Sequence, residues 1–196
     1  MAGYHHGDLR EAILAGSASV IEREGIEALS LRAVAADIGV SHTAFRRHFG
    51  SREGVLNALA VQGSRILAEH LRINSGSIID IGVAYVRFAL AHPGHFTVMF
   101  RDDLLDNDDP ELASARAQSL APLHDSVRAL GLPDPAAAQV ASWGVVHGVA
   151  TLALNGTLMA ALGGPLQNSA DPAELETLTR RALHLLHPEL QPHSEK

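Results

Sequence analysis

Residues 31–49 read Leu31-Arg-Ala-Val-Ala-Ala-Asp-Ile-Gly-Val-Ser-His-Thr-Ala-Phe-Arg-Arg-His-Phe49, two short helical patterns on either side of a glycine. The apolar residues of the first pattern recur at i, i+3, i+4 and i+7, the spacing of one helix face. They are Leu31, Val34, Ala35 and Ile38. Gly39 then allows a backbone turn that other residues resist. In the second pattern Phe45 and Phe49 supply an apolar face, which leaves the polar residues to point elsewhere.

A helix, a glycine turn and a second helix with a polar face make a helix-turn-helix, whose second helix fits the major groove of DNA. Ser41 can cap that second helix. Its polar residues are His42, Thr43, Arg46, Arg47 and His48. Arginine and histidine donate hydrogen bonds to phosphates or guanine, and threonine bonds a base or touches a thymine methyl. Residues 41–52 hold three arginines and no acid, in a chain whose formal charge is −7. If the protein binds a polyanion, we therefore expect these residues to contact it. On charge alone, an ordinary arginine-rich helix face is an equally good interpretation.

The rest of the chain also has helix patterns, and alternating strand patterns are scarce. Aspartate precedes proline at three places where a helix can begin, namely Asp109-Pro110, Asp134-Pro135 and Asp171-Pro172. We expect an all-α chain of about nine helices, with an N-terminal three-helix head and a C-terminal helical bundle. The expected helices span residues 8–24, 31–38, 42–48, 52–73, 77–91, 94–102, 110–130, 135–162 and 172–187.

Composition narrows the classes of function. The chain has 196 residues, of which 46% are hydrophobic, so a sizeable core can form. It has no cysteine, which excludes disulfides, thiolate metal sites and a cysteine nucleophile. No uninterrupted apolar run reaches the roughly 18 residues of a membrane span, and the start lacks a signal-peptide pattern. We therefore expect a cytoplasmic protein with no membrane partner. Because the common hydrolase, P-loop, dinucleotide and zinc-protease motifs are missing, we expect neither an enzyme nor a cofactor.

The head resembles the DNA-binding region of TetR-family transcriptional regulators. The resemblance rests on residues 30–56, including the ending Arg47-His-Phe49 and the following Ser51-Arg-Glu53, and on the opening Tyr4-His-His-Gly-Asp-Leu-Arg10. Later segments resemble the Trp–His–Gly type of TetR C-terminal domain. These segments are Tyr85-Val-Arg-Phe88, Ala91-His-Pro-Gly-His-Phe96, Val98-Met-Phe100 and Trp143-Gly-Val-Val-His-Gly148.

This resemblance implies a homodimeric repressor or activator that binds a palindromic double-stranded DNA operator. A small molecule entering the C-terminal domain would release the DNA. The DNA-binding domain would be residues 1–50, and the effector-binding and dimerisation domain would be residues 51–196. A protein of the same fold that has lost DNA binding and serves as an interaction or scaffold protein is the alternative.

Carried onto this chain, the family pattern assigns DNA contacts to individual side chains. The residues that would hold phosphates are Ser30, Arg32, Thr43 and Arg52. Those that would face base edges are His42 and Arg46. Arg46 is a departure, because the family usually has tyrosine there; arginine can also hold a phosphate, with two hydrogen bonds.

Most of the bulky side chains beyond residue 63 gather in a few segments and are candidates for an effector pocket. They are Phe88, Phe96, Met99, Phe100 and Trp143. Core packing is the simpler interpretation, and the wall of a pocket for a partly apolar effector is the sharper one. His147 lies one turn after Trp143 on the same helix face, where it either bonds a neighbouring group or anchors the effector.

The last two helices are expected to form the dimer interface. The segment 135–162 carries hardly any charge, and the final helix has a broad apolar stripe that includes Leu175, Leu178, Ala182 and Leu185. So much apolar surface calls for a second subunit, in a symmetric four-helix seam. The pairs His92/His95 and His184/His187 have a spacing that can bind metal but no evident third ligand, so we expect no metal site.

Overall fold

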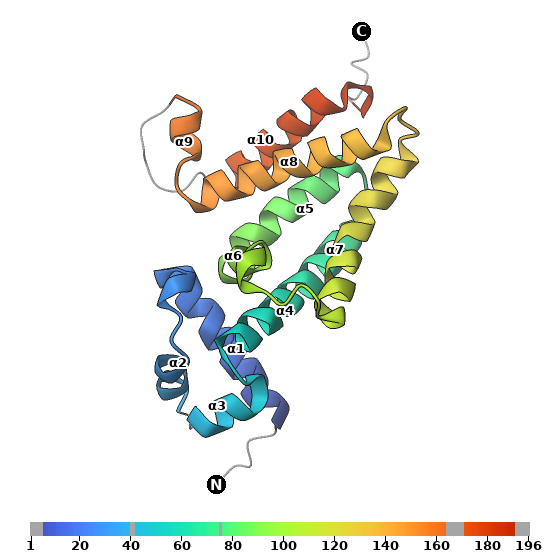
Figure 1. The fold of residues 1–196 in the computed structure, drawn as a ribbon. Coiled ribbons are helices and arrows are strands. Elements are labelled where there is room, and N and C mark those ends of the chain that lie inside the picture. The colour runs from blue at the N-terminus through green and yellow to red at the C-terminus, as the bar shows by residue number, and fades with distance from the viewer. Residues whose placement is uncertain (1–5, 40–41, 75, 164–170, 191–196) are drawn as a thin grey trace. The chain divides into compact units, whose positions relative to one another are not determined.

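The structure is a computed structural model that describes residues 6–39, 42–74, 76–163 and 171–190 (Figure 1). Within these residues the regular elements are all helical, which confirms the expected all-α class. The elements are α1 (His6–Glu24), η1 (Ile26–Ala28), α2 (Leu31–Asp37), α3 (His42–Phe49), α4 (Arg52–Ile73), α5 (Ile78–Ala91), α6 (Pro93–Met99), η2 (Asp102–Leu104), α7 (Pro110–Ala129), α8 (Pro135–Leu154), α9 (Leu158–Ala161), α10 (Pro172–Leu186) and η3 (Pro188–Leu190).

The aspartate–proline pairs start helices as expected. The Asp134 side chain accepts a hydrogen bond from the Ala137 backbone N–H at 3.0 Å, and Pro135 opens α8. Asp171 caps α10 in the same way. These carboxylates satisfy backbone donors that a helix leaves unpaired in its first turn, and they suit the helix dipole.

The expectation of one helix over residues 135–162 is wrong. The α8 helix ends at Leu154, and a separate short helix, α9, begins at Leu158. Gly156 adopts a φ of +66°, which side-chain-bearing residues rarely adopt. The Gly156 N–H donates to Ala153 at 3.1 Å, and the Thr157 N–H donates to Leu152 at 3.0 Å. This pair of bonds is the Schellman ending of a helix. Asn155-Gly156 carried that signal in the sequence, and the long apolar pattern around it concealed the break.

The described residues divide into two compact units that the sequence interleaves. The first unit takes its residues from 1–66 and 92–117, so it contains α1–α3, most of α4, α6 and the start of α7. The second takes its residues from 67–91 and 118–196, which include α5, α8 and α10. The expected boundary between residues 50 and 51 divides the chain differently and stays a prediction.

The core of the first unit joins the helix-turn-helix to elements far along the chain. Ile13, Leu14 and Val34 pack in one apolar cluster with residues of α4, α6 and α7. Its members beyond residue 50 are Val55, Leu56, Leu59, Ala60, Val61, Val98, Leu105, Leu112 and Ala115. The helix-turn-helix therefore lacks a complete core of its own.

A fragment of residues 1–50 is accordingly expected to be unfolded. It lacks Val55, Leu56 and Leu59, each of which is 0% exposed in the folded chain. Burial of each such side chain contributes about 1.5–3 kcal/mol, which is large against a typical domain stability of about 5–15 kcal/mol. Far-ultraviolet circular dichroism of the fragment should show no cooperative melting. A cooperative transition would instead show that residues 1–50 form an autonomous domain.

In the second unit α5, α8 and α10 pack against one another in pairs. Gly82 of α5 lies close to α10, since a Cβ atom there would collide with the Leu183 side chain. Two ion pairs join α5 to α10: Arg87 with Glu176, and Arg180 with Asp80 at 3.0 Å. By length and composition alone, the α8 helix is long and apolar enough to cross a membrane. Of its most apolar stretch of 18 residues, 17% are buried within the protein.

Candidate DNA-binding surface and effector region

The first helix of the helix-turn-helix has a cap and a glycine ending that match the sequence pattern. The Ser30 side chain accepts a hydrogen bond from the Ala33 N–H at 3.4 Å, which caps α2. Gly39 follows α2 with a φ of +72°. The positive φ is the turn conformation for which glycine is suited. Ser41, the expected cap of α3, lies outside the described residues.

The second helix, α3, presents most of its expected DNA contacts to solvent. Thr43, Arg46 and Arg47 are exposed, and Arg32 of α2 is exposed as well. His48 is partly buried. The side chain of His42 lies outside the part of the chain that the structure describes. The exposed groups share the first unit and can supply donors to phosphates or bases without leaving a buried partner unpaired.

The junction of α3 and α4 is tightly built. Gly50 has a φ of +71°, and its N–H donates to Arg46 at 2.8 Å. Ser51 caps α4 by accepting from the Gly54 N–H at 3.3 Å, and its hydroxyl also holds the pKa of Glu53 below the usual value. A Cβ atom on Gly54 would collide with the Phe49 carbonyl oxygen. Glycine is thus needed where α4 begins beneath the end of α3.

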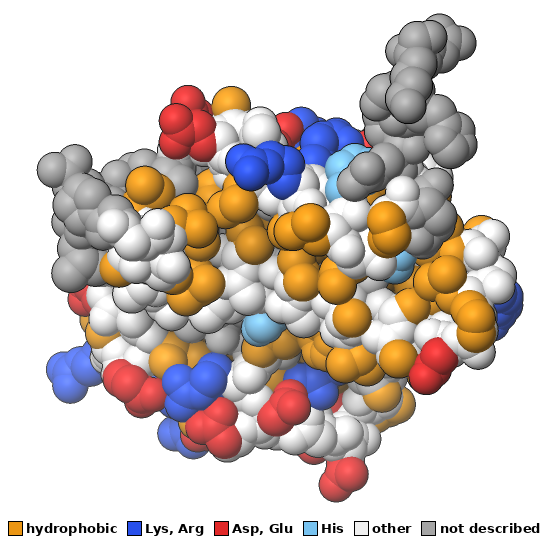
Figure 2. Space-filling view, turned by 90° about the horizontal axis from the view of Figure 1, so that it is seen from above, with side chains coloured by type: hydrophobic (Ala, Val, Ile, Leu, Met, Phe, Trp, Pro, Cys, Tyr) orange, Lys and Arg blue, Asp and Glu red, His pale blue; other side chains and the backbone are white. Residues whose placement is uncertain are grey.

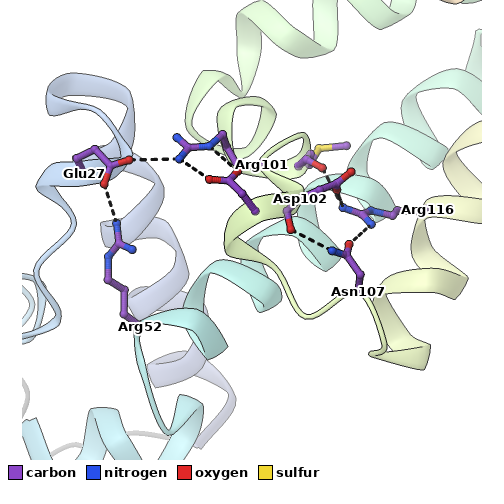
Figure 3. A network of polar contacts seen from close by, with 8 residues as sticks. Glu27, Arg52, Arg101, Asp102, Asn107 and Arg116 are labelled. Atoms are coloured by element: carbon purple, nitrogen blue, oxygen red, sulfur yellow. Dashed lines mark hydrogen bonds and ion pairs between the residues drawn. The ribbon is translucent and has the colours of Figure 1, made fainter.

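Arg52, for which a phosphate contact is expected, also makes contacts inside the head. Its guanidinium donates to the Ile26 carbonyl at 2.6 Å and to the Leu29 carbonyl at 3.3 Å. Glu27 adds an ion pair at 4.0 Å (Figure 3). These contacts tie the first residue of α4 to the segment just before α2. No short sequence pattern predicts these contacts, because the partners are backbone carbonyls 23 and 26 residues away.

Arg10 of α1 was not among the expected site residues. Its guanidinium lies over the Phe49 ring, 5.5 Å from the ring centre, and both residues line a cleft of about 450 Å³. The lining also includes acidic residues, among them Glu53, Asp109 and Glu111. No residue of the expected effector pocket lines this cleft among those that the structure describes.

The six expected effector residues fall into the two units. Phe96, Met99 and Phe100 belong to the first. Phe96 is 5% exposed and meets Phe100 edge to face at 5.1 Å, and Met99 packs where a Cβ on Gly63 would come within 2.7 Å of its sulfur. Phe88, Trp143 and His147 belong to the second unit.

A polar trio lies inside the second unit and includes one residue that was not expected, Tyr85. The Tyr85 hydroxyl is 2.9 Å from His147 Nδ1 and accepts from Trp143 Nε1–H at 3.4 Å. The Tyr85 oxygen has lone pairs with which to accept from Trp143, and the direction of its bond to His147 Nδ1 is set by the tautomer of the histidine. Burial lowers the pKa of His147 and raises that of Tyr85, so both groups stay neutral near pH 7.

The expected dimer residues differ in exposure. Leu175 is 2% exposed within the single chain, whereas Leu185 is 82% exposed. Leu178 and Ala182 are partly buried. On α8, Val140 is 69% exposed. Figure 2, which looks onto α8 and α10 from above, shows hydrophobic side chains gathered in a belt with charged side chains along its margins.

One histidine of each expected pair is hydrogen-bonded within the chain. His95 bonds Gln62 at 2.9 Å, and burial lowers the pKa of His95 to about 4. His187 bonds Ser142 at 2.8 Å. Among the described residues, no group of three or more His, Cys, Asp or Glu side chains is arranged to hold a metal ion.

Two family models match the chain in the expected order. Residues 13–59 match the model described as bacterial regulatory proteins, tetR family. Residues 78–173 match the model described as tetracyclin repressor-like, C-terminal domain. The Trp–His–Gly subtype is not part of that description and stays a prediction.

Individual proteins of similar sequence or structure point to the same family. An uncharacterized HTH-type transcriptional regulator of Mycobacterium tuberculosis, Rv0681, is 28% identical over 157 residues, which are 76% of this chain and 72% of the relative. The structure of a protein with unknown function from Rhodococcus sp. RHA1 has a TM-score of 0.72 and 29% identity, covering 93% of this chain and 97% of that one. The TetR family regulator PfmR from Thermus thermophilus, at 20% identity, shares the fold, with a TM-score of 0.64 over 92% of this chain and 99% of its own. The chain belongs to the TetR family of transcriptional regulators.

Proposed function

We propose that the protein is a homodimeric repressor that binds a palindromic operator and releases it when a small molecule enters the C-terminal domain. The observation that carries the proposal is the exposed row of Thr43, Arg46 and Arg47 on α3, held in a head that matches the family model. Two such heads in a symmetric dimer would place one α3 in each half-site of a palindrome.

The exposed residues of the head are proposed to keep the roles that the family pattern implies. Arg32, Thr43 and Arg47 hold phosphates, while Arg46 faces a base. Ser30 already accepts from a backbone N–H, so its hydroxyl proton is available to a phosphate. Arg52 keeps the proposed phosphate contact and also bonds the Ile26 and Leu29 carbonyls through Nη2 and Nε.

Replacing Arg46 by alanine and replacing Arg47 by alanine are expected to change DNA binding in different ways. Arg47→Ala should weaken binding to every duplex and lower the salt slope of log K by about 1, because a phosphate contact is lost. Arg46→Ala should relax preference at one operator position at a cost of about 1–3 kcal/mol. Fluorescence anisotropy across operator variants and salt concentrations separates the two, with Arg72→Ala of α4 as a control arginine. The opposite pattern would exchange the two roles.

The effector is proposed to be a small, partly apolar molecule that meets the neighbourhood of Trp143 and His147. Support comes from the neutral polar trio that these residues form with Tyr85 in an otherwise apolar helix packing. A few polar groups among apolar side chains are typical of sites that orient small ligands.

The dimer is proposed to form through α8 and α10. The outward side of α8 is apolar or small, and it includes the exposed Val140 and Gly144 and the partly buried Gly148. Among the described residues, a Cβ atom on either glycine would meet no atom within 4 Å. Glycine in a helix interior costs about 1 kcal/mol relative to alanine. Because nothing in the chain itself requires the small side chain, a closely approaching second copy explains it better than internal packing does.

Selection of bound duplexes from a random DNA pool at physiological salt tests the proposal. Enrichment of a roughly palindromic site by the purified protein is the expected result. A well-folded dimer that enriches no sequence would overturn the operator proposal and favour an interaction protein built on the same fold.

A further inference from the structure

One carboxylate, that of Glu27, lies between two arginines that come from different parts of the first unit. Glu27 belongs to η1, the short turn between α1 and α2. Its Oε2 is 4.0 Å from Arg52, and its Oε1 accepts from Arg101 at 3.4 Å (Figure 3). The carboxylate thus bridges the start of α4 to the segment that follows α6.

At one end of this bridge, Arg52 holds the backbone just before α2, the first helix of the helix-turn-helix. Arg52 holds the carbonyls of Ile26 and Leu29, and Leu29 immediately precedes the cap of α2. It therefore sets the start of α2 relative to the start of α4. The α3 helix is joined to α2 by the Gly39 turn and to α4 by the Gly50 turn, so its position depends on both ends.

The Arg101 side is oriented before it reaches Glu27. The Arg101 guanidinium makes two hydrogen bonds to the Asp103 carboxylate, both at 2.9 Å. The same connection between α6 and α7 is fastened a second time, since Arg116 bonds Asp102 at 2.5 Å and Asn107 at 2.9 Å (Figure 3). A paired, planar guanidinium loses little further freedom when it meets another acceptor.

Other polar groups of the segment between α6 and α7 contact α4 and not η1. Asn57 of α4 bonds Asp109 and accepts from the Asp106 N–H at 3.2 Å. These contacts hold the connection to α4, whereas Arg101 reaches the turn between the first two helices of the head. We infer that Glu27 and Arg101 are positioning residues for operator binding, which through Arg52 set α2 and hence α3 in the helix-turn-helix. The inference rests on the proposed function.

The size of the effect is limited by exposure. Glu27 is 77% exposed, and exposed ion pairs are worth at most about 1 kcal/mol, or about fivefold in an equilibrium constant. The bridge therefore adjusts position and contributes little to global stability. The melting temperature of a Glu27→Gln variant should stay close to that of the parent.

The sign of the effect on DNA binding separates this role from simple electrostatics. Removing a negative charge from a DNA-binding head should tighten binding through the long-range field alone. Glu27→Gln is instead expected to weaken binding to the selected duplex by about two- to fivefold. Amide exchange in α2 and α3 of the DNA-free protein should quicken by a similar factor, since local opening becomes easier. This second measurement needs no operator, so it tests the bridge even if no duplex is selected.

A double-mutant cycle completes the test. Arg101→Gln should match Glu27→Gln in both measurements, and the double variant should be no worse than the more affected single variant. Glu111→Gln is the matched control, because it removes a carboxylate that pairs with Arg65 at 2.9 Å in the same unit. It should leave exchange in α2 and α3 unchanged. Unchanged exchange in Glu27→Gln, tighter duplex binding by that variant, or additive effects of the two changes would each overturn the bridge.

Discussion

Replacing Gly144 with glutamate is expected to convert the dimer into monomers. Gly144 is exposed on α8, and a Cβ atom there would meet no atom of the described residues within 4 Å. The monomer should therefore fold normally, with a small gain in helix propensity. In a seam formed by two copies of α8, two carboxylates would be buried without partners. The dimer dissociation constant should rise on the order of a thousandfold.

Sedimentation velocity across a range of concentrations measures this change. Ala117→Glu is the matched control, since it adds the same charge at an exposed position of α7. The control should stay dimeric. A Gly144→Glu protein that remains dimeric at micromolar concentration would place the interface away from this face of α8. Leu178→Glu, on the partly buried stripe of α10, would then test that helix separately.

Loss of the dimer should also be visible in DNA binding. A palindromic operator gives each half-site to one head, and a monomer can use only one. The Gly144→Glu protein should therefore bind a full operator and an isolated half-site with similar affinity. The head itself is unchanged, so the weak half-site affinity should match that of the parent.

Much of the fold could be predicted because its signals are local. Helix starts at Asp134 and Asp171, and the turn at Gly39, depend on residues a few positions apart. The end of α8 was missed because the apolar pattern continues past Asn155-Gly156, so the pattern outweighed a turn signal of two residues. Hydrophobic periodicity reports burial, and it does not report where the backbone changes direction.

The candidate site was predicted less completely, and the reason is sequence separation. Exposed residues of α3 could be named from the motif alone. The partners of Arg52 and the Tyr85–His147 contact span 23 to 62 residues, and no short pattern encodes them. Leu175 shows the same limit. An apolar stripe on a helix does not reveal which of its residues are buried within the single chain and which stay exposed.

Gly54→Ala is expected to impair operator binding strongly although it lies on α4 and not on α3. Alanine normally favours a helix over glycine by about 1 kcal/mol. Here the added Cβ would collide with the Phe49 carbonyl oxygen, a backbone atom of the last residue of α3. Such a collision cannot be relieved by a side-chain rotation, so the end of α3 must move. Overpacking of this kind costs about 1–3 kcal/mol, and a displaced recognition helix should lower operator affinity on the order of ten- to a hundredfold.

Anisotropy titration of the selected duplex, together with a thermal melt, checks this expectation. Gly16→Ala is the matched control in the same unit, because its Cβ would meet only side-chain atoms of Ile38 and Val34, at 3.3 and 3.4 Å. Those side chains can give by a few tenths of an ångström, so the control should bind DNA within about twofold of the parent. Normal affinity in Gly54→Ala would mean that the end of α3 can shift without cost. The tight junction with α4 would then have no part in holding Arg46 and Arg47 against the operator.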